Sequence, residues 1–148
     1  MRKGFGHILM CCGLMLILTH VSCKMDTSHN GDLDGYWKLT SIDSLTIGTT
    51  CDYTNRSIFW SVQKNLMNVR DNAGGKEYVF RFEQTDSSLT IYNGQIYDKL
   101  RGNEFVEDMS ELSPFGINSQ PAHYVIDHLS SRRMTLHDDQ LRLNFKKL

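Results

Sequence analysis

The sequence predicts an all-β fold, a small antiparallel up-and-down barrel of about eight strands with one short helix. Three observations support this prediction. Apolar and polar residues alternate from residue 36 to the C-terminal segment, as they do in half-buried strands. Residues that favour tight turns, namely Gly, Asn, Asp and Ser, separate the alternating runs. The length of 148 residues suits a single domain.

The predicted strands follow from the alternation. In the first run Trp37 and Leu39 alternate with polar neighbours, and in a later one Tyr78, Phe80 and Phe82 share a face. The runs lie at residues 36–40, 58–69, 78–83, 89–91, 124–126, 134–136 and 141–145, and the turn sequences at 72–75, 85–88, 93–94, 130–131 and 137–140. Short strands joined by short turns form a meander, and closure of a meander into a barrel removes its exposed edges.

One segment departs from the alternation. Asn103 suits a helix N-cap, and acids at 104, 107 and 108 suit the first turns of a helix. Apolar residues then follow at helical spacing, at Phe105, Val106, Met109 and Leu112. Pro114 would end the helix. We therefore expect a helix of about nine residues that lies across one mouth of the barrel or along its side.

The N-terminal residues have the features of an export signal. Arg2 and Lys3 form a positive start, and an uncharged run covers Ile8–Leu18. This run is too short for a transmembrane helix, which needs ~20 apolar residues. A small residue, Ser22, precedes Cys23. We therefore predict a signal peptide at 1–22, a polar tether at 23–34 and the barrel domain at 35–148.

Val21-Ser22-Cys23 resembles the lipobox of bacterial lipoproteins, in which the cysteine after the cleavage site carries the lipid. His20 departs from the apolar residue usual at its position. The resemblance implies a lipid on Cys23 that anchors the protein to the outer membrane, on its periplasmic or its surface side. The alternative is a plain secreted protein with Cys23 free or bridged to Cys51. A lipidated Cys23 leaves Cys51 without a partner, so no intramolecular disulfide is expected.

Gly35-Tyr36-Trp37 resembles the Gly-X-Trp signature of lipocalins, in which the Trp plugs the base of the barrel. Together with the lipobox, the tether, a Pro-Phe-Gly-Ile segment at 114–117 and the last strand, it resembles the lipocalin-like domain of unknown function found in Bacteroidota lipoproteins. The resemblance covers roughly residues 33–148 and implies a barrel without catalytic residues and without an agreed ligand. The chain is shorter than a standard lipocalin and lacks its disulfides, which argues against a deep ligand cup.

No motif of a catalytic or metal site is present in the sequence: His-Glu-X-X-His, Gly-X-Ser-X-Gly, Cys-X-X-Cys and the P-loop are all absent. His123 and His128 would point to opposite faces of one regular strand and could not share a metal. We therefore expect no enzyme, no metal and no cofactor. A formal net charge of −1 gives no basic footprint for nucleic acid.

Aromatic residues are the candidates for ligand binding. Trp37, Trp60, Phe105 and Phe115 could line a pocket for a small apolar or glycan ligand. Alternatively the rings fill the barrel, because the interior of an eight-stranded barrel is just wide enough for its own side chains. We favour a filled core with a shallow pocket at the mouth near Phe105 and Phe115.

Two functions remain open. One is a binding module for a small amphiphile or glycan fragment. The other is a non-enzymatic accessory protein of the cell envelope that docks on another envelope protein through a barrel face or residues 103–118.

Overall fold

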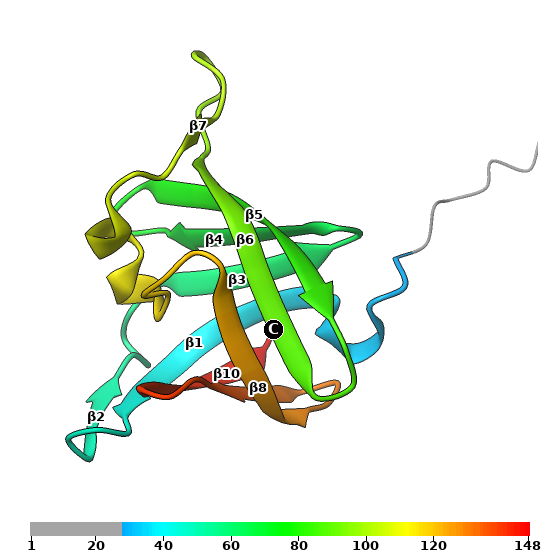
Figure 1. The fold of residues 1–148 in the computed structure, drawn as a ribbon, viewed down its shortest axis with the longest axis vertical. Coiled ribbons are helices and arrows are strands. Elements are labelled where there is room, and N and C mark those ends of the chain that lie inside the picture. Colours follow the sequence, from blue (N-terminus) through cyan, green and yellow to red (C-terminus); the bar gives the residue numbers. More distant parts are fainter. Residues whose placement is uncertain (1–27) are drawn as a thin grey trace, which may run out of the picture.

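The computed structural model describes residues 28–148. The predicted signal peptide, Cys23 and the first part of the tether lie outside the described residues. The chain forms mainly strands (Figure 1). In chain order the elements are η1 (Gly31–Leu33), β1 (Gly35–Ser44), β2 (Thr49–Asp52), β3 (Ile58–Gln63), β4 (Leu66–Asp71), β5 (Lys76–Gln84), β6 (Ser88–Ile96), β7 (Glu104–Phe105), η2 (Met109–Glu111), η3 (Ser113–Phe115), β8 (Ala122–Leu129), β9 (Arg133–His137) and β10 (Leu141–Lys147), where η marks a 3₁₀ turn.

Antiparallel pairing closes the strands into a barrel. The order around the barrel is β1, β3, β4, β5, β6, β8, β9, β10, and β10 pairs back onto β1 from Trp37–Lys147 to Ser44–Leu141. β2 extends the sheet along the second half of β1, and β7 pairs with the end of β6. The predicted antiparallel barrel of about eight strands is confirmed.

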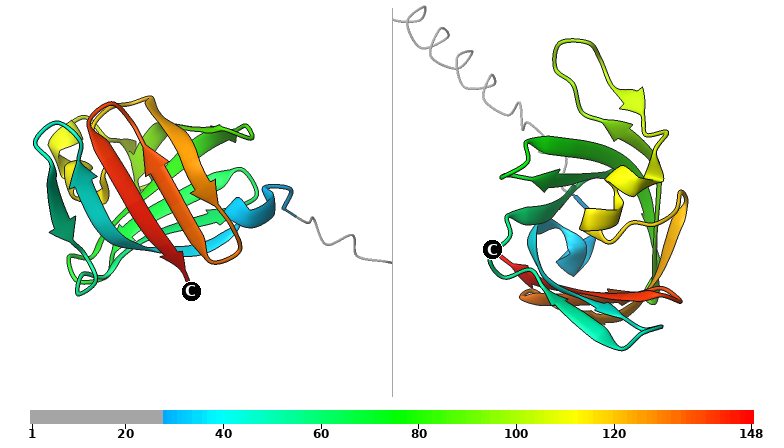
Figure 2. Two further views of the ribbon diagram at one scale, coloured as in Figure 1. Left: turned by 90° about the horizontal axis from the view of Figure 1, so that it is seen from below. Right: turned by 90° about the vertical axis from the view of Figure 1, so that its left-hand side faces the viewer.

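Short 3₁₀ turns cover both ends of the barrel (Figure 2, right). At one end, here called the tether end, η1 buries Leu33 completely. The turns β3–β4, β5–β6 and β8–β9 and the C-terminus lie at this end, because each follows a strand that runs toward Gly35 or its neighbours. At the other end, here called the plug end, η2 and η3 lie across the mouth and bury Leu112 and Phe115. The described part of the predicted tether is therefore packed onto the barrel.

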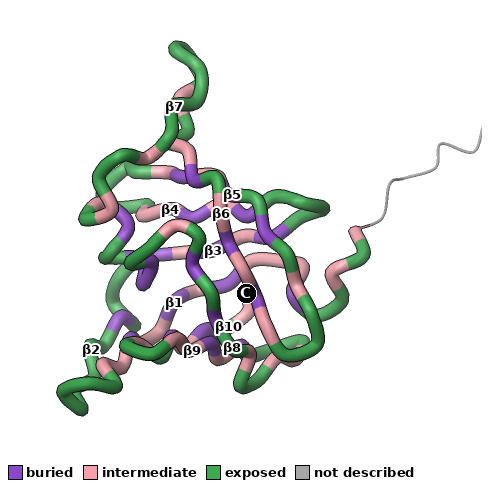
Figure 3. Tube along the Cα trace, in the orientation of Figure 1, coloured by how far each residue is buried: buried purple, intermediate pink, exposed green. Residues whose placement is uncertain are grey.

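The barrel interior is packed with apolar side chains. Buried and exposed positions alternate along the strands (Figure 3). One cluster of buried residues runs from Leu33 at the tether end to Phe115 at the plug end. In its centre Trp60 packs against Phe145 and Tyr124, with ring centroids 5.0 and 6.1 Å apart. Offset and edge-to-face ring pairs at such distances are favourable.

The helical segment differs in extent from the sequence prediction. Glu104 and Phe105, expected in the helix, pair with the free edge of β6 as β7. The helical part begins only after Asp108, whose carboxylate accepts a hydrogen bond from Ser110 N at 2.9 Å. It ends at Gly116, whose φ of +83° is the left-handed conformation that favours glycine. No helix within residues 28–148 has the length and apolarity needed to cross a bilayer.

Candidate ligand-binding pockets

Three of the four aromatic residues predicted to bind ligand lie in the core. Trp37 and Trp60 are completely buried, and Phe115 is 2% exposed. Trp37 Nε1 donates a hydrogen bond to the carbonyl of Leu33 at 2.8 Å. Phe115 packs edge-on against Tyr78, with ring centroids 5.4 Å apart. Trp37 thus holds η1 at the tether end, and Phe115 belongs to the cover of the plug end.

The fourth predicted residue, Phe105, lies outside the barrel and is 63% exposed. It borders a shallow groove of about 310 Å³ on the outer face of β4, β5 and β6. The other residues of this groove are Leu66, Val79, Phe80, Arg81, Asn93, Gln95 and Asn103. The four predicted residues are therefore not brought together in one site.

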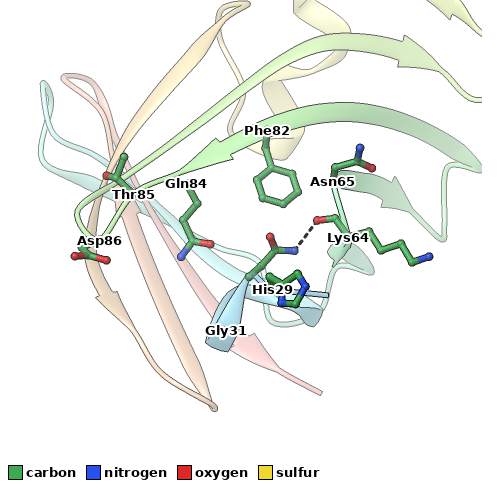
Figure 4. A pocket seen from close by; sticks show the side chains of 9 residues that line it. His29, Gly31, Lys64, Asn65, Phe82, Gln84, Thr85 and Asp86 are labelled. Atoms are coloured by element: carbon green, nitrogen blue, oxygen red, sulfur yellow. Dashed lines mark hydrogen bonds between the residues drawn. The ribbon is translucent and has the colours of Figure 1, made fainter. Parts of the chain in front are cut away.

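A different pocket, of about 430 Å³, opens at the tether end (Figure 4). Its floor is the ring of Phe82, which points inward from β5 and is 9% exposed. Gln84, two positions further along β5, stands at the rim on the same face. The remaining residues around the pocket are His29, Asn30, Gly31, Lys64, Asn65, Thr85 and Asp86.

A polar cluster fixes one wall of this pocket. Asn30 Nδ2 donates to the carbonyl of Lys64 at 2.6 Å, and Lys64 N donates to Ser28 Oγ at 2.9 Å. Ser28 Oγ in turn donates to Asp34 Oδ1 at 2.7 Å. These bonds join residues 28–34 to the β3–β4 turn, where Lys64 has a φ of +57°. The wall is thus held by hydrogen bonds of the Ser28 and Asn30 side chains to the backbone of Lys64, which is distant in sequence.

Four polar side chains at the rim of the pocket have no partner in the described part of the chain. Within residues 28–148, the side chains of His29, Asn65, Gln84 and Asp86 make no hydrogen bond or ion pair. They offer an imidazole, two amides and a carboxylate above an aromatic floor. Such a set can form several directional hydrogen bonds to a small polar molecule while the ring contacts its apolar face.

No metal centre is formed in the described part of the chain, which contains no group of three His, Cys, Asp or Glu side chains placed to hold an ion. Cys51 is free and exposed on β2. His123 Nδ1 lies 3.1 Å from Thr90 Oγ1, and His128 Nε2 lies 3.2 Å from Ser130 Oγ. Both histidines thus contact hydroxyl groups on the outer surface.

The sequence reasoning did not identify the tether-end pocket. One signal was present: the inward face of β5 reads Tyr78, Phe80, Phe82 and then Gln84, so a polar residue ends an apolar face. No local pattern indicated that His29 would lie beside it, because residues 23–34 were expected to be a tether outside the domain.

The comparisons with known proteins agree on the fold. The family model of the lipocalin-like domain matches residues 15–148. A lipocalin-like protein from Bacteroides uniformis superposes with a TM-score of 0.61 at 20% identity, over 80% of this chain and 100% of that one. An uncharacterized protein from Bacteroides eggerthii gives 0.58 at 20% identity, over 78% and 99%. A protein from Burkholderia xenovorans gives 0.51 at 14% identity, over 83% and 90%. None of the curated proteins matches.

Proposed function

Since the chain belongs to the lipocalin-like domain family, we propose that it is a binding module rather than an enzyme, and that it holds a small glycan fragment in the tether-end pocket. The observation that carries this proposal is the ring of Phe82 beneath a rim of polar side chains that have no partner among residues 28–148. A sugar ring has an apolar C–H face and a circle of hydroxyl groups, and both parts find complementary groups here.

The packing of the barrel favours a glycan over an amphiphile. An alkyl chain needs a long apolar cavity, and buried side chains from Trp37 to Phe145 occupy the centre of this barrel. The pocket above Phe82 is wide and polar at its rim. A compact polar ligand therefore fits the site better than a fatty acid.

We also propose that Cys23 carries a lipid and that the protein is exported to the cell envelope, anchored in the outer membrane on its periplasmic or surface side. Four residues lie between Cys23 and Ser28, the first described residue, so five residue-to-residue steps join the two. A fully extended chain of that length spans about 17 Å, at ~3.3–3.6 Å per residue. The anchor would therefore hold the tether end of the barrel close to the bilayer. Growth with labelled palmitate tests this: label on the Cys51→Ala protein and none on the Cys23→Ala protein is expected, and label on both contradicts it.

Ligand binding is tested by NMR titration of the protein with a panel of monosaccharides, disaccharides and short fatty acids. We expect a saccharide to shift the resonances of residues 82–86. Gln84→Ala should weaken its binding about tenfold, the equivalent of one or two lost hydrogen bonds. Gln140→Ala, in the exposed turn before β10, is the matched control and should bind normally. Binding of a fatty acid alone, or saccharide binding that Gln84→Ala leaves unchanged, would contradict the proposal.

The second candidate function is an envelope accessory protein that docks on a protein partner. One observation favours it: Leu100, in the loop between β6 and β7, is 96% exposed, and Phe105, on β7, is 63% exposed. Exposed apolar side chains on one projection are typical of interaction surfaces. A pull-down from solubilised envelope with wild-type protein and with Leu100→Ser tests it; a partner captured equally well by both proteins would argue against this loop.

A further inference from the structure

Three cationic side chains meet in a groove on the outer face of the barrel. Arg132 and Arg133 come from the β8–β9 turn and the start of β9, and Lys146 from the end of β10. The groove has a volume of about 540 Å³. Its other residues are Thr40, Thr135, Asn144 and Phe145. We call this surface the cationic groove.

The cations of the groove have no carboxylate partner in residues 28–148, where no ion pair involves Arg132, Arg133 or Lys146. The neutral polar groups beside them are satisfied: Thr40 Oγ1 donates to the carbonyl of Asn144 at 2.9 Å, and Thr135 Oγ1 donates to Asn144 Oδ1 at 3.3 Å. The groove therefore presents a local excess of positive charge.

Two other cations of the barrel have carboxylate partners. On the same strand as Lys146, Arg142 Nε lies 3.4 Å from Asp127 Oδ2. At the plug end, Lys76 Nζ lies 3.3 Å from Glu111 Oε2. Residues 98–111 carry five acids, Asp98, Glu104, Glu107, Asp108 and Glu111, against two cations, Lys99 and Arg101. The cationic groove thus differs from these two sites, because its three cations have no carboxylate beside them in residues 28–148.

The cationic groove lies at the end where the N-terminal segment reaches the barrel. Lys147 N donates to the carbonyl of Arg132 at 2.9 Å, and Lys147 pairs with Trp37 near the start of β1. The β8–β9 turn and the C-terminus accordingly lie beside η1 (Figure 2, left). Twenty-seven residues precede the described chain at this end, Cys23 among them.

We propose that the cationic groove docks the barrel on an anionic phospholipid bilayer, with lipid phosphates held by Arg132, Arg133 and Lys146. Guanidinium groups pair with phosphate through two parallel hydrogen bonds, and an ammonium group adds a point charge. The bilayer is the occupant that fits, because the predicted anchor site is joined to the same end of the barrel. In the order of strands around the closed barrel, β9 and β10 lie opposite β4 and β5. Docking through β9 and β10 therefore leaves the pocket above Phe82 open to solvent.

The test uses the chain from Lys24 onward, which lacks the lipid-bearing residue and contains every described strand. Binding to vesicles of phosphatidylcholine, alone or mixed with phosphatidylglycerol, is measured by sedimentation at low and at physiological salt. We expect binding only to the mixed vesicles and a decrease with salt. The triple variant Arg132→Gln, Arg133→Gln, Lys146→Gln should bind roughly 100-fold more weakly, at about fivefold per cation.

A matched triple variant, Arg56→Gln, Lys99→Gln, Arg101→Gln, removes the same charge from exposed positions at the plug end. It should bind within about threefold of the wild-type protein, because these cations lie far from the docked surface. Circular dichroism verifies that all three proteins are folded. Equal losses in both triple variants, no loss in the first, or full displacement from vesicles by low-millimolar inorganic phosphate would each overturn the proposal. Vesicle binding involves no saccharide and no lipidated cysteine, so its outcome is independent of the proposed function.

Discussion

The side chain of Lys147 lies over the indole of Trp37, with Nζ 4.8 Å from the ring centroid. The same Nζ donates a hydrogen bond to the carbonyl of Asp32 at 2.8 Å, and Trp37 Nε1 donates to that of Leu33 at 2.8 Å. The last strand, the first strand and η1 are thereby joined at one point. The tether end of the barrel is therefore closed jointly by the two ends of the domain.

Gly35 leaves room for this contact. Its φ is +126°, and a Cβ atom on it would lie 2.5 Å from Lys147 Cε. We expect Gly35→Ala to lower the free energy of unfolding by about 3 kcal/mol, since backbone strain and a displaced Lys147 add together. Gly48→Ala, at a φ of +68° in open space, should cost about 1 kcal/mol. Urea denaturation followed by circular dichroism measures both.

A double-mutant cycle isolates the steric part of that effect. In the Lys147→Ala background the clash is absent, so Gly35→Ala should cost about 1 kcal/mol less than in the wild-type protein. Equal costs of Gly35→Ala in the two backgrounds would show that Lys147 does not occupy the space above Gly35.

The two tryptophans provide a second prediction. Both are completely buried, but Trp60 Nε1 has no hydrogen-bond partner among the described residues, whereas Trp37 Nε1 has the carbonyl of Leu33. Trp37→Phe leaves a carbonyl unpaired, and Trp60→Phe removes an unpaired N–H. We therefore expect Trp37→Phe to destabilise the protein by about 2 kcal/mol more than Trp60→Phe. Urea denaturation measures the free energy of unfolding of both variants. A larger loss of stability in Trp60→Phe would contradict the assignment of the two N–H groups.

The strands could be predicted because a period of two reports directly which side chains face inward. Tyr78, Phe80 and Phe82 were expected on one face and are all buried. Bulges could not be predicted in this way. His123 and His128 were expected on opposite faces, but the pairing of β8 with β9 shifts between Ile126 and His128, and both histidines are exposed. One extra residue reverses the alternation beyond it.

The candidate pocket could not be predicted, because its walls come from contacts between distant segments. Asn30 reaches the carbonyl of Lys64, 34 positions away.

The secondary structure at Phe105 was predicted wrongly for a different reason. Its spacing suited a helix, but the unpaired edge of β6 offers backbone hydrogen bonds to β7, and tertiary pairing of this kind overrides local propensity. That a residue is aromatic also does not indicate how deeply its side chain is buried, as the exposed Phe105 and the buried Phe115 show.

The cover of the plug end depends on a buried hydrogen bond. Tyr124 Oη donates to the carbonyl of Gly116 at 2.9 Å, and burial raises the pKa of the Tyr124 hydroxyl far above its ordinary value. Tyr124→Phe leaves that carbonyl without this donor and should cost about 1.5 kcal/mol in the free energy of unfolding. Tyr92→Phe removes an exposed hydroxyl that lies 3.3 Å from Glu83 Oε1, and it should cost less than about 0.5 kcal/mol. Similar costs for the two variants would mean that the Tyr124 bond does not hold η3.

Glu111 gives the plug end a pH dependence. Tyr78 Oη donates to Glu111 Oε2 at 2.8 Å and Lys76 Nζ lies 3.3 Å away, and together they hold the pKa of the Glu111 carboxyl below its ordinary value of 4.5. Because the folded state has the lower pKa, this stabilisation is complete above the ordinary pKa and is lost as the pH falls through the folded value. Urea midpoints measured from neutral pH down to about pH 3 should therefore fall less steeply for Glu111→Gln than for the wild-type protein. Tyr78→Phe should flatten the same region, since it removes the largest cause of the shift, and an unchanged acid slope in both variants would exclude this contact as its source.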